Sequence, residues 1–144
     1  MIIGTIEFVE LEKKLQKTNS CYLDILAPDL GKAYVIAISR DHCPSCKQQK
    51  PRLDKLATKV VQKHGDRVVF TRIHIRYTEG SSEESLRSKD VFRHYFYPTN
   101  LILVKTRDRG VFEYYRNAAP EMNELGRNIE VALETAVMLA KDTN

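Results

Sequence analysis

Residues 33–47 read AYVIAISRDHCPSCK: an apolar segment, a short polar turn and two cysteines separated by two residues. The segment Ala33–Ser39 is apolar almost throughout and partly β-branched, which predicts a strand buried on both faces. A helix is expected to follow from about Cys43 to His64. The two cysteines therefore lie where a buried strand passes into a helix.

This position predicts different chemistry for the two thiols. Cys43 is expected at the helix N-cap, with Pro44 at the first helical position, where the missing N–H costs nothing. The free backbone donors and the helix dipole favour a thiolate on Cys43, the form that attacks disulfides. Three nearby basic side chains favour it as well: Arg40, His42 when protonated, and Lys47. Cys43 is therefore expected to be the exposed nucleophile. Cys46, one turn further on the apolar side of the helix, is expected to be buried and suited to resolve a mixed disulfide.

The rest of the chain predicts alternating strands and helices. Phe8, Leu11 and Leu15 have helical spacing, so a helix is expected over Thr5–Lys17, and a short strand over Cys21–Leu26. Later elements are expected as a strand at Arg67–Ile75, a short helix capped by Ser81 and Glu84 and reaching Phe92 or His94, strands at Asn100–Lys105 and Val111–Arg116, and a helix at Pro120–Lys141. The tight turn between the last two strands predicts an antiparallel pair. The fold class is α/β: a mixed β-sheet with helices on both faces.

Composition narrows the class of protein. With 144 residues and 42% hydrophobic residues, a single domain spanning 1–144 is expected, and its three cysteines are not a disulfide scaffold. The longest apolar run has six residues, far short of the roughly 18 that a membrane span needs. Residues 1–7 do not resemble a secretory signal, so the expected compartment is the reducing cytoplasm.

The net charge of +4 is unevenly distributed. Residues 40–76 carry ten Lys and Arg against three Asp, a balance of +7. A nucleic-acid footprint is one interpretation. However, Lys55, Lys59 and Lys63 recur every four residues, away from the apolar stripe of the same helix, as on a solvated helix face. No nucleic-acid partner and no membrane partner is expected.

Metal binding and core packing are the alternatives for the cysteine pair. A CxxC sequence can be half of a zinc site, but zinc needs four ligands, and the other candidates (Cys21, His42, His64, His74 and His94) form no second pair. Copper(I) held by Cys43, Cys46 and His42 is a further alternative. No metal and no cofactor is expected. Cys21 has no assigned role and is expected to be a small core residue.

Two segments of the chain resemble the thioredoxin superfamily. Residues 43–51, CPSCKQQKP, are similar to its active-site helix, with a Lys after the second cysteine and a proline, Pro51, five residues beyond it. Residues 97–105, YPTNLILVK, are similar to the segment in which a cis-proline, here Pro98, opens a central strand beside the cysteines. The resemblance covers residues 32–140, and residues 1–31 form an N-terminal extension, helical in part, without a counterpart.

The resemblance implies a thiol-disulfide oxidoreductase of cell redox homeostasis, with Cys43 and Cys46 as catalytic residues. Its implied partners are protein disulfide substrates and a reductase or other electron donor. Substrate binding is implied for His42, Tyr97 and Pro98, and supporting roles for Pro44, Ser45, Lys47 and Pro51. The direction of electron flow and the oligomeric state stay open.

The chain also departs from the family pattern. Ala37 occupies the position of a buried Asp that assists the second cysteine, and His42 and Ser39 stand where tryptophans are usual. Arg72 is expected to replace the Lys that faces the Asp. These losses keep a second function open: a catalytically weak thioredoxin-like adapter that binds proteins. Of the aromatic residues near Pro98, Phe92 and Phe96 are expected in the core.

Overall fold

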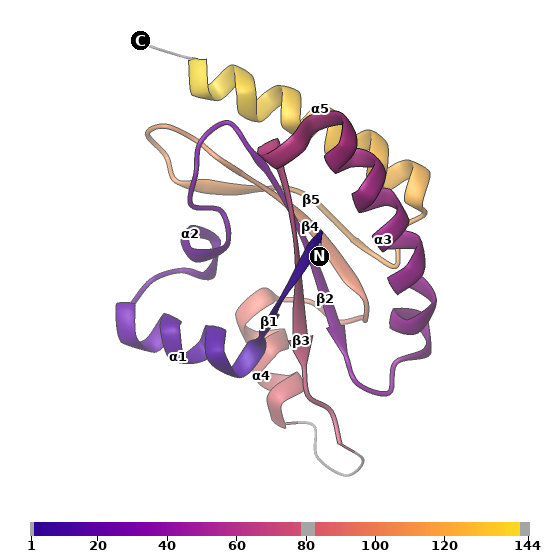
Figure 1. The fold of residues 1–144 in the computed structure, drawn as a ribbon. Coiled ribbons are helices and arrows are strands. Elements are labelled where there is room, and N and C mark those ends of the chain that lie inside the picture. The colour runs from indigo at the N-terminus through magenta and orange to yellow at the C-terminus, as the bar shows by residue number, and fades with distance from the viewer. Residues whose placement is uncertain (1, 79–82, 142–144) are drawn as a thin grey trace.

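A computed structural model describes residues 2–78 and 83–141 of the chain. Its centre is a five-stranded sheet with the order β1-β3-β2-β4-β5 (Figure 1). The strands are β1 Ile3–Glu7, β2 Ala33–Arg40, β3 Val68–Ile75, β4 Thr99–Lys105 and β5 Val111–Ala118. Both β1 and β2 run parallel to β3, while β4 is antiparallel to β2 and to β5. The α/β class and the mixed sheet are confirmed.

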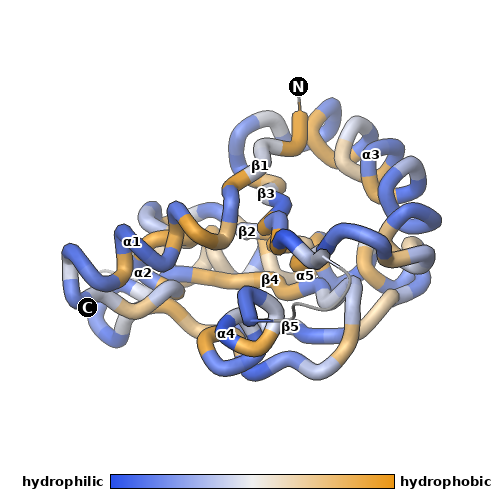
Figure 2. Tube along the Cα trace, turned by 90° about the horizontal axis from the view of Figure 1, so that it is seen from below, coloured by the Kyte–Doolittle hydropathy of each residue, from blue (hydrophilic) through white to orange (hydrophobic). Residues whose placement is uncertain are grey.

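Helices cover both faces of this sheet (Figure 1). They are α1 Phe8–Thr18, α2 Tyr22–Leu26, α3 Pro44–His64, α4 Glu83–Phe92 and α5 Met122–Lys141, with a 3₁₀ turn, η1, at Gly65–Arg67. One core cluster joins α3 and α5 to one face of the sheet, and a second joins α1 and α4 to the other. Figure 2 shows β4 hydrophobic over much of its length, while hydrophobic and polar residues alternate along α3.

The buried central strand shows why the sheet needs both layers. All residues of Ala33–Ile38 are buried, and successive side chains enter opposite core clusters. Ala33, Val35 and Ala37 contribute to the cluster under α3, whereas Tyr34, Ile36 and Ile38 contribute to the cluster under α1 and α4. The strands predicted at Ala33–Ser39, Arg67–Ile75, Asn100–Lys105 and Val111–Arg116 are confirmed, and so are the long helix α3, the β4–β5 hairpin and the final helix.

Two predictions for the N-terminal region are wrong. The first helix begins at Phe8, because Ile3–Glu7 is a strand whose backbone pairs with β3 from Ile3↔Phe70 to Glu7↔His74. The segment expected as a strand at Cys21–Leu26 is the helix α2. Five largely apolar residues do not distinguish the two structures by periodicity, and here Leu26 and Ala27 pack into the core.

Two further expectations concern the helix α4 and the possibility of a membrane span. The helix α4 is confirmed, but its expected cap, Ser81, lies outside the described residues. Within residues 2–78 and 83–141, no helix is long and apolar enough to span a membrane.

Candidate active site

Cys43 and Cys46 form a disulfide at the N-terminus of α3, with their Cα atoms 5.2 Å apart. Cys43 is the N-cap in an extended conformation, Pro44 begins the helix and Pro51 lies inside it, as predicted. The backbone N–H of Cys46 donates to Cys43 Sγ over 3.2 Å. His42 adopts a left-handed conformation (φ 54°) that turns the chain from β2 into α3. The helix N-terminus therefore directs a backbone donor at one sulfur of the pair.

The burial of the two cysteines is the reverse of the prediction. Cys43 is 4% exposed, whereas Cys46 is only partly buried. The cover over Cys43 comes from a segment 54 residues away, because its Sγ lies 3.8 Å from the carbonyl oxygen of Tyr97. Position along α3 alone therefore does not decide which sulfur is shielded.

The Tyr97–Pro98 peptide bond is cis, and Pro98 is buried. The Tyr97 hydroxyl lies 2.8 Å from Ser85 Oγ and 3.0 Å from Ser88 Oγ. Ser88 Oγ lies 3.0 Å from His94 Nε2, and the rings of His94 and Tyr97 meet edge to face at 4.8 Å. We call Ser85, Ser88, His94 and Tyr97 the tyrosine network. It fixes the residue whose carbonyl oxygen contacts Cys43.

Burial determines the state of the histidine in this network. His94 is 2% exposed, and its burial lowers its pKa to about 4, assisted by the positive charges of Lys89 and Arg116. The imidazole is therefore neutral at pH 7. Sequence patterns pointed to neither serine, because both network serines are brought to Tyr97 only by the packing of α4.

Exposed aromatic side chains lie directly before the cis-proline. Tyr95 is 78% exposed and Phe96 is 68% exposed, whereas Phe92 is fully buried. The core placement is confirmed for Phe92 and is wrong for Phe96. The chain reverses at Arg93 (φ 59°), and this turn separates the buried end of α4 from the exposed pair.

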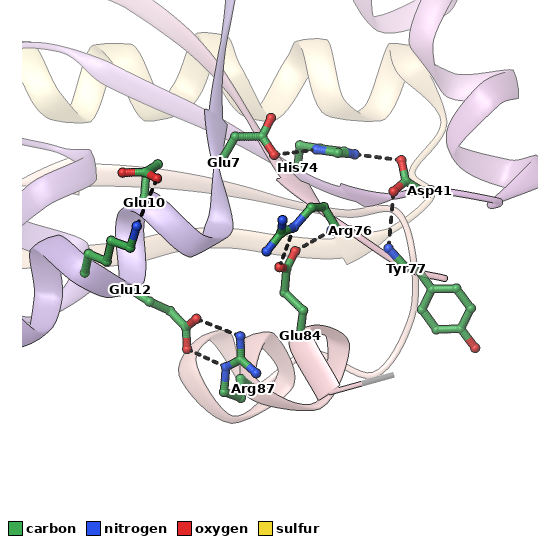
Figure 3. Close-up of polar contacts among 10 residues, drawn as sticks. Glu7, Glu10, Glu12, Asp41, His74, Arg76, Tyr77, Glu84 and Arg87 are labelled. Atoms are coloured by element: carbon green, nitrogen blue, oxygen red, sulfur yellow. Dashed lines mark hydrogen bonds and ion pairs between the residues drawn. The ribbon is translucent and has the colours of Figure 1, made fainter. Parts of the chain in front are cut away.

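A charged cluster lies at the start of the cysteine loop. His74 on β3 is held between Glu7 Oε1 and Asp41 Oδ1, each 2.7 Å from one ring nitrogen (Figure 3). The other oxygen of Asp41 accepts from the backbone N–H of Tyr77 over 3.2 Å. We call Glu7, Asp41 and His74 the His74 cluster. It ties β1 and β3 to the residue two positions before Cys43.

Within the cluster, the pKa values of His74 and Asp41 shift in opposite directions. Burial alone would lower the pKa of His74, but the hydrogen bonds to Asp41 and Glu7 outweigh it and raise the pKa. The hydrogen bond from His74 in turn lowers the pKa of Asp41. The contacts with the two carboxylates therefore favour the protonated form of His74, and the contact with His74 favours the ionised form of Asp41. The sequence offered His74 only as a metal-ligand candidate, because its partners come from β1 and from the loop after β2.

Ion pairs fasten α4, which carries both network serines. The guanidinium of Arg87 donates to the two carboxylate oxygens of Glu12 on α1, over 2.9 and 3.1 Å (Figure 3). At the other end, Glu84 accepts from Arg76 Nε over 3.0 Å and from the Arg76 backbone N–H. The position of Tyr97 thus depends on contacts that reach the N-terminal helix.

Known structures share this arrangement of strands and helices. The chain superimposes on thioredoxin NaTrxh from Nicotiana alata with a TM-score of 0.60 over 91% of this chain and 92% of the other, at 18% identity. The chain has the thioredoxin fold. Spinach chloroplast thioredoxin f in its short form matches with a TM-score of 0.56 and 18% identity over 90% and 92% of the two chains. A thioredoxin f2 solved in complex with ferredoxin:thioredoxin reductase matches with 0.57 and 16% over 90% and 94%. No family model and no curated protein matches the chain.

The sheet of this thioredoxin fold has an unusual interior near the cysteines. Ala37 is 2% exposed and lies directly opposite Arg72 on β3, as the sequence predicted. On its other side Ala37 pairs with Asn100 of β4, which is fully buried with neither amide atom hydrogen-bonded to another described residue. Arg72 Nη2 forms an ion pair with Asp54 Oδ1 over 3.5 Å, but it makes no hydrogen bond with any described residue. Polar groups therefore surround Ala37 although it carries none itself.

Most of the remaining residues singled out in the sequence are exposed on the surface. His42, Pro44, Ser45 and Lys47 are exposed at the surface beside the disulfide, and so are Lys55, Lys59 and Lys63 further along α3. Cys21 is an exposed free thiol, so its placement in the core is wrong. The described residues contain no group of three or more His, Cys, Asp or Glu side chains placed to hold a metal ion.

Proposed function

We propose that this protein is a thiol-disulfide oxidoreductase that exchanges disulfides with protein substrates through Cys43 and Cys46. The observation that carries the proposal is the disulfide at the N-terminus of α3, where the Cys46 N–H donates to Cys43 Sγ over 3.2 Å. In the reduced protein this donor and the helix dipole stabilise a thiolate on Cys43. A cysteine pair in this setting is suited to reversible chemistry.

The exchange proceeds in two balanced steps. The Cys43 thiolate attacks one sulfur of the substrate disulfide, forms a mixed disulfide and expels the other substrate sulfur as a thiolate. Cys46 then loses its proton and attacks Cys43 Sγ, which closes the Cys43–Cys46 bond and releases the second substrate thiolate. Two electrons pass from the protein to the substrate, and both expelled thiolates take up protons according to their pKa values. The reverse sequence oxidises a substrate dithiol.

The substrate segment is proposed to lie beside Tyr97 and Pro98. The Tyr97 carbonyl oxygen already contacts Cys43 Sγ, so an extended segment pairing with this backbone would bring its own sulfur next to the reacting one. His42, on the exposed turn before Cys43, completes this substrate-binding edge. Ser45 and Lys47 belong to the first turn that carries the cysteines, and Pro44 and Pro51 shape the same helix.

The proposed partners are a disulfide-bearing protein and a reductase or other thiol donor that restores the dithiol. The complex of a thioredoxin f2 with ferredoxin:thioredoxin reductase supports this kind of partner. We propose a reducing compartment such as the cytoplasm and no resident cofactor. We also propose a single domain over 1–144 around a core of 32–140, since β1 pairs with β3 and Phe8 packs into the same cluster as Ile36.

Trapping of the mixed disulfide tests the proposal and the order of attack. The variant Cys46→Ser leaves Cys43 free to attack but removes the resolving thiol, so we expect a stable covalent adduct with a disulfide-bearing protein such as insulin. Cys43→Ser should form far less adduct, and the turnover of each variant should fall by on the order of a thousandfold or more. Adducts are counted by non-reducing gels and mass spectrometry.

Cys21→Ser is the matched control, because Cys21 is the exposed third cysteine. It should retain wild-type turnover. A larger adduct yield from Cys43→Ser would assign the attack to the less buried Cys46. If the wild-type protein forms no adduct and reduces no disulfide, the oxidoreductase proposal is wrong, and the adapter hypothesis gains support.

A further inference from the structure

A pocket of about 340 Å³ opens beside the disulfide, between the first turns of α3 and the ends of β1, β2 and β3. Both Cys43 and Cys46 line it. Tyr97 does not, so this pocket is distinct from the backbone edge proposed above for the substrate segment. A group bound in the pocket would lie next to the reacting sulfurs while the substrate backbone lies along Tyr97.

The walls of the pocket are strongly basic. Its cationic side chains are Arg40, Lys47, Lys50 and Arg72. Among the described residues, one carboxylate lines it, that of Asp41, and both of its oxygens already accept hydrogen bonds, from His74 and from the Tyr77 backbone. His74 also lines the pocket, and its ring nitrogen Nδ1 lies 2.7 Å from Glu7 Oε1, which is outside the pocket. The interior therefore keeps an excess of positive charge beside the sulfurs.

Several polar groups of the pocket have hydrogen-bonding capacity left over. Across residues 2–78 and 83–141, neither Lys47 nor Lys50 has a carboxylate within ion-pair distance. Arg72 Nη2 is buried and forms an ion pair with Asp54 Oδ1 over 3.5 Å, but it makes no hydrogen bond within these same residues. Gln49 is 8% exposed, lines the pocket and has an Oε1 atom likewise unpartnered. Buried polar groups without partners are uncommon, so this set fits a bound polar group.

We propose that the pocket binds an aspartate or glutamate side chain next to the disulfide cysteine of the protein substrate. This inference rests on the proposed function and specifies its substrate class: disulfides flanked by acidic residues. The carboxylate would accept from Lys50, Lys47 and Arg72, and Gln49 Oε1 would accept a backbone N–H of the same segment. Because the pocket is partly closed to water, these charges act more strongly than on an open surface.

Three peptides with an internal disulfide test the proposal. They are identical except that the residues flanking one cysteine are Glu, Gln or Lys. Pre-reduced protein is mixed with each peptide, and the rate of a single turnover is divided by the rate of the same peptide with uncharged dithiothreitol, which removes differences in intrinsic reactivity. At low ionic strength the Glu peptide should react about tenfold faster than the Gln peptide, and the Lys peptide more slowly than both.

Salt and charge reversal locate the effect. Raising the salt from about 20 mM to about 500 mM should bring the Glu-to-Gln ratio close to one. Lys50→Glu should bring it to one or below, and since the result is a ratio, a change in Cys43 reactivity cancels. The matched control is Lys55→Glu, an exposed α3 position that does not line this pocket, which should keep the wild-type ratio.

The outcomes separate this inference from the proposed function. If all three peptides are reduced at equal normalised rates, or if the preference for Glu survives Lys50→Glu, acidic recognition by this pocket is overturned and the oxidoreductase activity stands. If the protein reduces none of the peptides, the proposed function fails and this inference fails with it.

Discussion

The two sides of the cysteine pair differ in how they hold their polar groups. On the α4 side, the tyrosine network contains no carboxylate, and the Tyr97 hydroxyl lies within hydrogen-bond distance of both serine hydroxyls. On the β1 and β3 side, the His74 cluster is ionic, and its histidine is 29% exposed at the side chain. One side positions the backbone that contacts Cys43, and the other sets the charge around the loop before it.

The same side-chain type shows the difference most directly. Among the described residues, His94 is buried with no carboxylate hydrogen-bonded to its ring and has a pKa of about 4, whereas His74 is half-buried between two carboxylates and has a raised pKa. Burial disfavours the charged form of both rings, but only His74 has anions that compensate. The environment and not the residue type therefore sets the direction of each pKa shift, and the stability of the fold should depend on pH with opposite sign through each.

The largest expected effect comes from His94. Its pKa is about 4 in the folded protein, against an ordinary value of 6.5, so on acidification the unfolded chain binds a proton that the folded protein excludes. The contribution is present above about pH 6.5 and is lost as the pH falls towards 4, with a magnitude of about 3 kcal/mol. Urea unfolding of the wild type and of His94→Gln at several pH values measures it.

The informative quantity is the difference in slope, because His94→Gln can lower the stability at every pH. The variant should lose markedly less free energy of unfolding between about pH 7 and pH 4 than the wild type. Equal slopes would show that His94 does not titrate differently in the two states, which would remove the contrast between the two sides.

A smaller effect is expected from Tyr97→Phe. The substitution removes the hydroxyl that lies within hydrogen-bond distance of Ser85 and Ser88 and leaves the ring in place. Loss of these partly buried hydrogen bonds should lower the free energy of unfolding by about 1–2 kcal/mol. Tyr95→Phe is the control: that tyrosine is 78% exposed and should change stability little. Similar effects of both substitutions would mean that the network does not stabilise the cis-proline segment.

The smallest effect is expected from His74→Gln, because the cluster is partly exposed and water screens it. Since the folded pKa of His74 is raised, its contribution is complete below about pH 6.5 and is lost as the pH rises through the folded value. The wild type should therefore lose stability on the alkaline side, and His74→Gln should lose less over the same range. The assigned direction of the His74 pKa shift would be contradicted if the free energy of unfolding of the wild type, relative to that of the variant, rose steadily above about pH 6.5.

Local sequence patterns predict the parts of the fold that local physics decides. The run at Ala33–Ser39 is apolar enough to specify a buried strand, and the Cys43–Pro44 pair marks the N-terminus of a helix that ends before Gly65. The strand β1 was missed because its pairing partner, β3, lies more than sixty residues away, and the spacing of Phe8, Leu11 and Leu15 extended the apparent helix backward.

The sequence predicted the cysteine pair, the cis-proline Pro98 and the position of Arg72 opposite Ala37, but not the contacts around them. The burial of Cys43 depends on its contact with Tyr97, which is 54 residues away in the sequence. The spacing of residues along the helix cannot predict this contact. Likewise Ser85, Ser88 and His74 belong to no motif, since each gains its role from a contact between elements that are distant in the chain. The pocket beside the disulfide was visible in the sequence only as a local excess of charge.

The edge strand β1 has a practical consequence for anyone handling this protein. Glu7 is the last residue of β1, and its carboxylate holds one ring nitrogen of His74. An affinity tag joined ahead of Ile3 can loosen this five-residue strand and move the Glu7 carboxylate away from His74. The tag would then alter the measured redox activity without touching a cysteine. Redox assays on an N-terminally tagged preparation should therefore be matched with a preparation tagged behind α5.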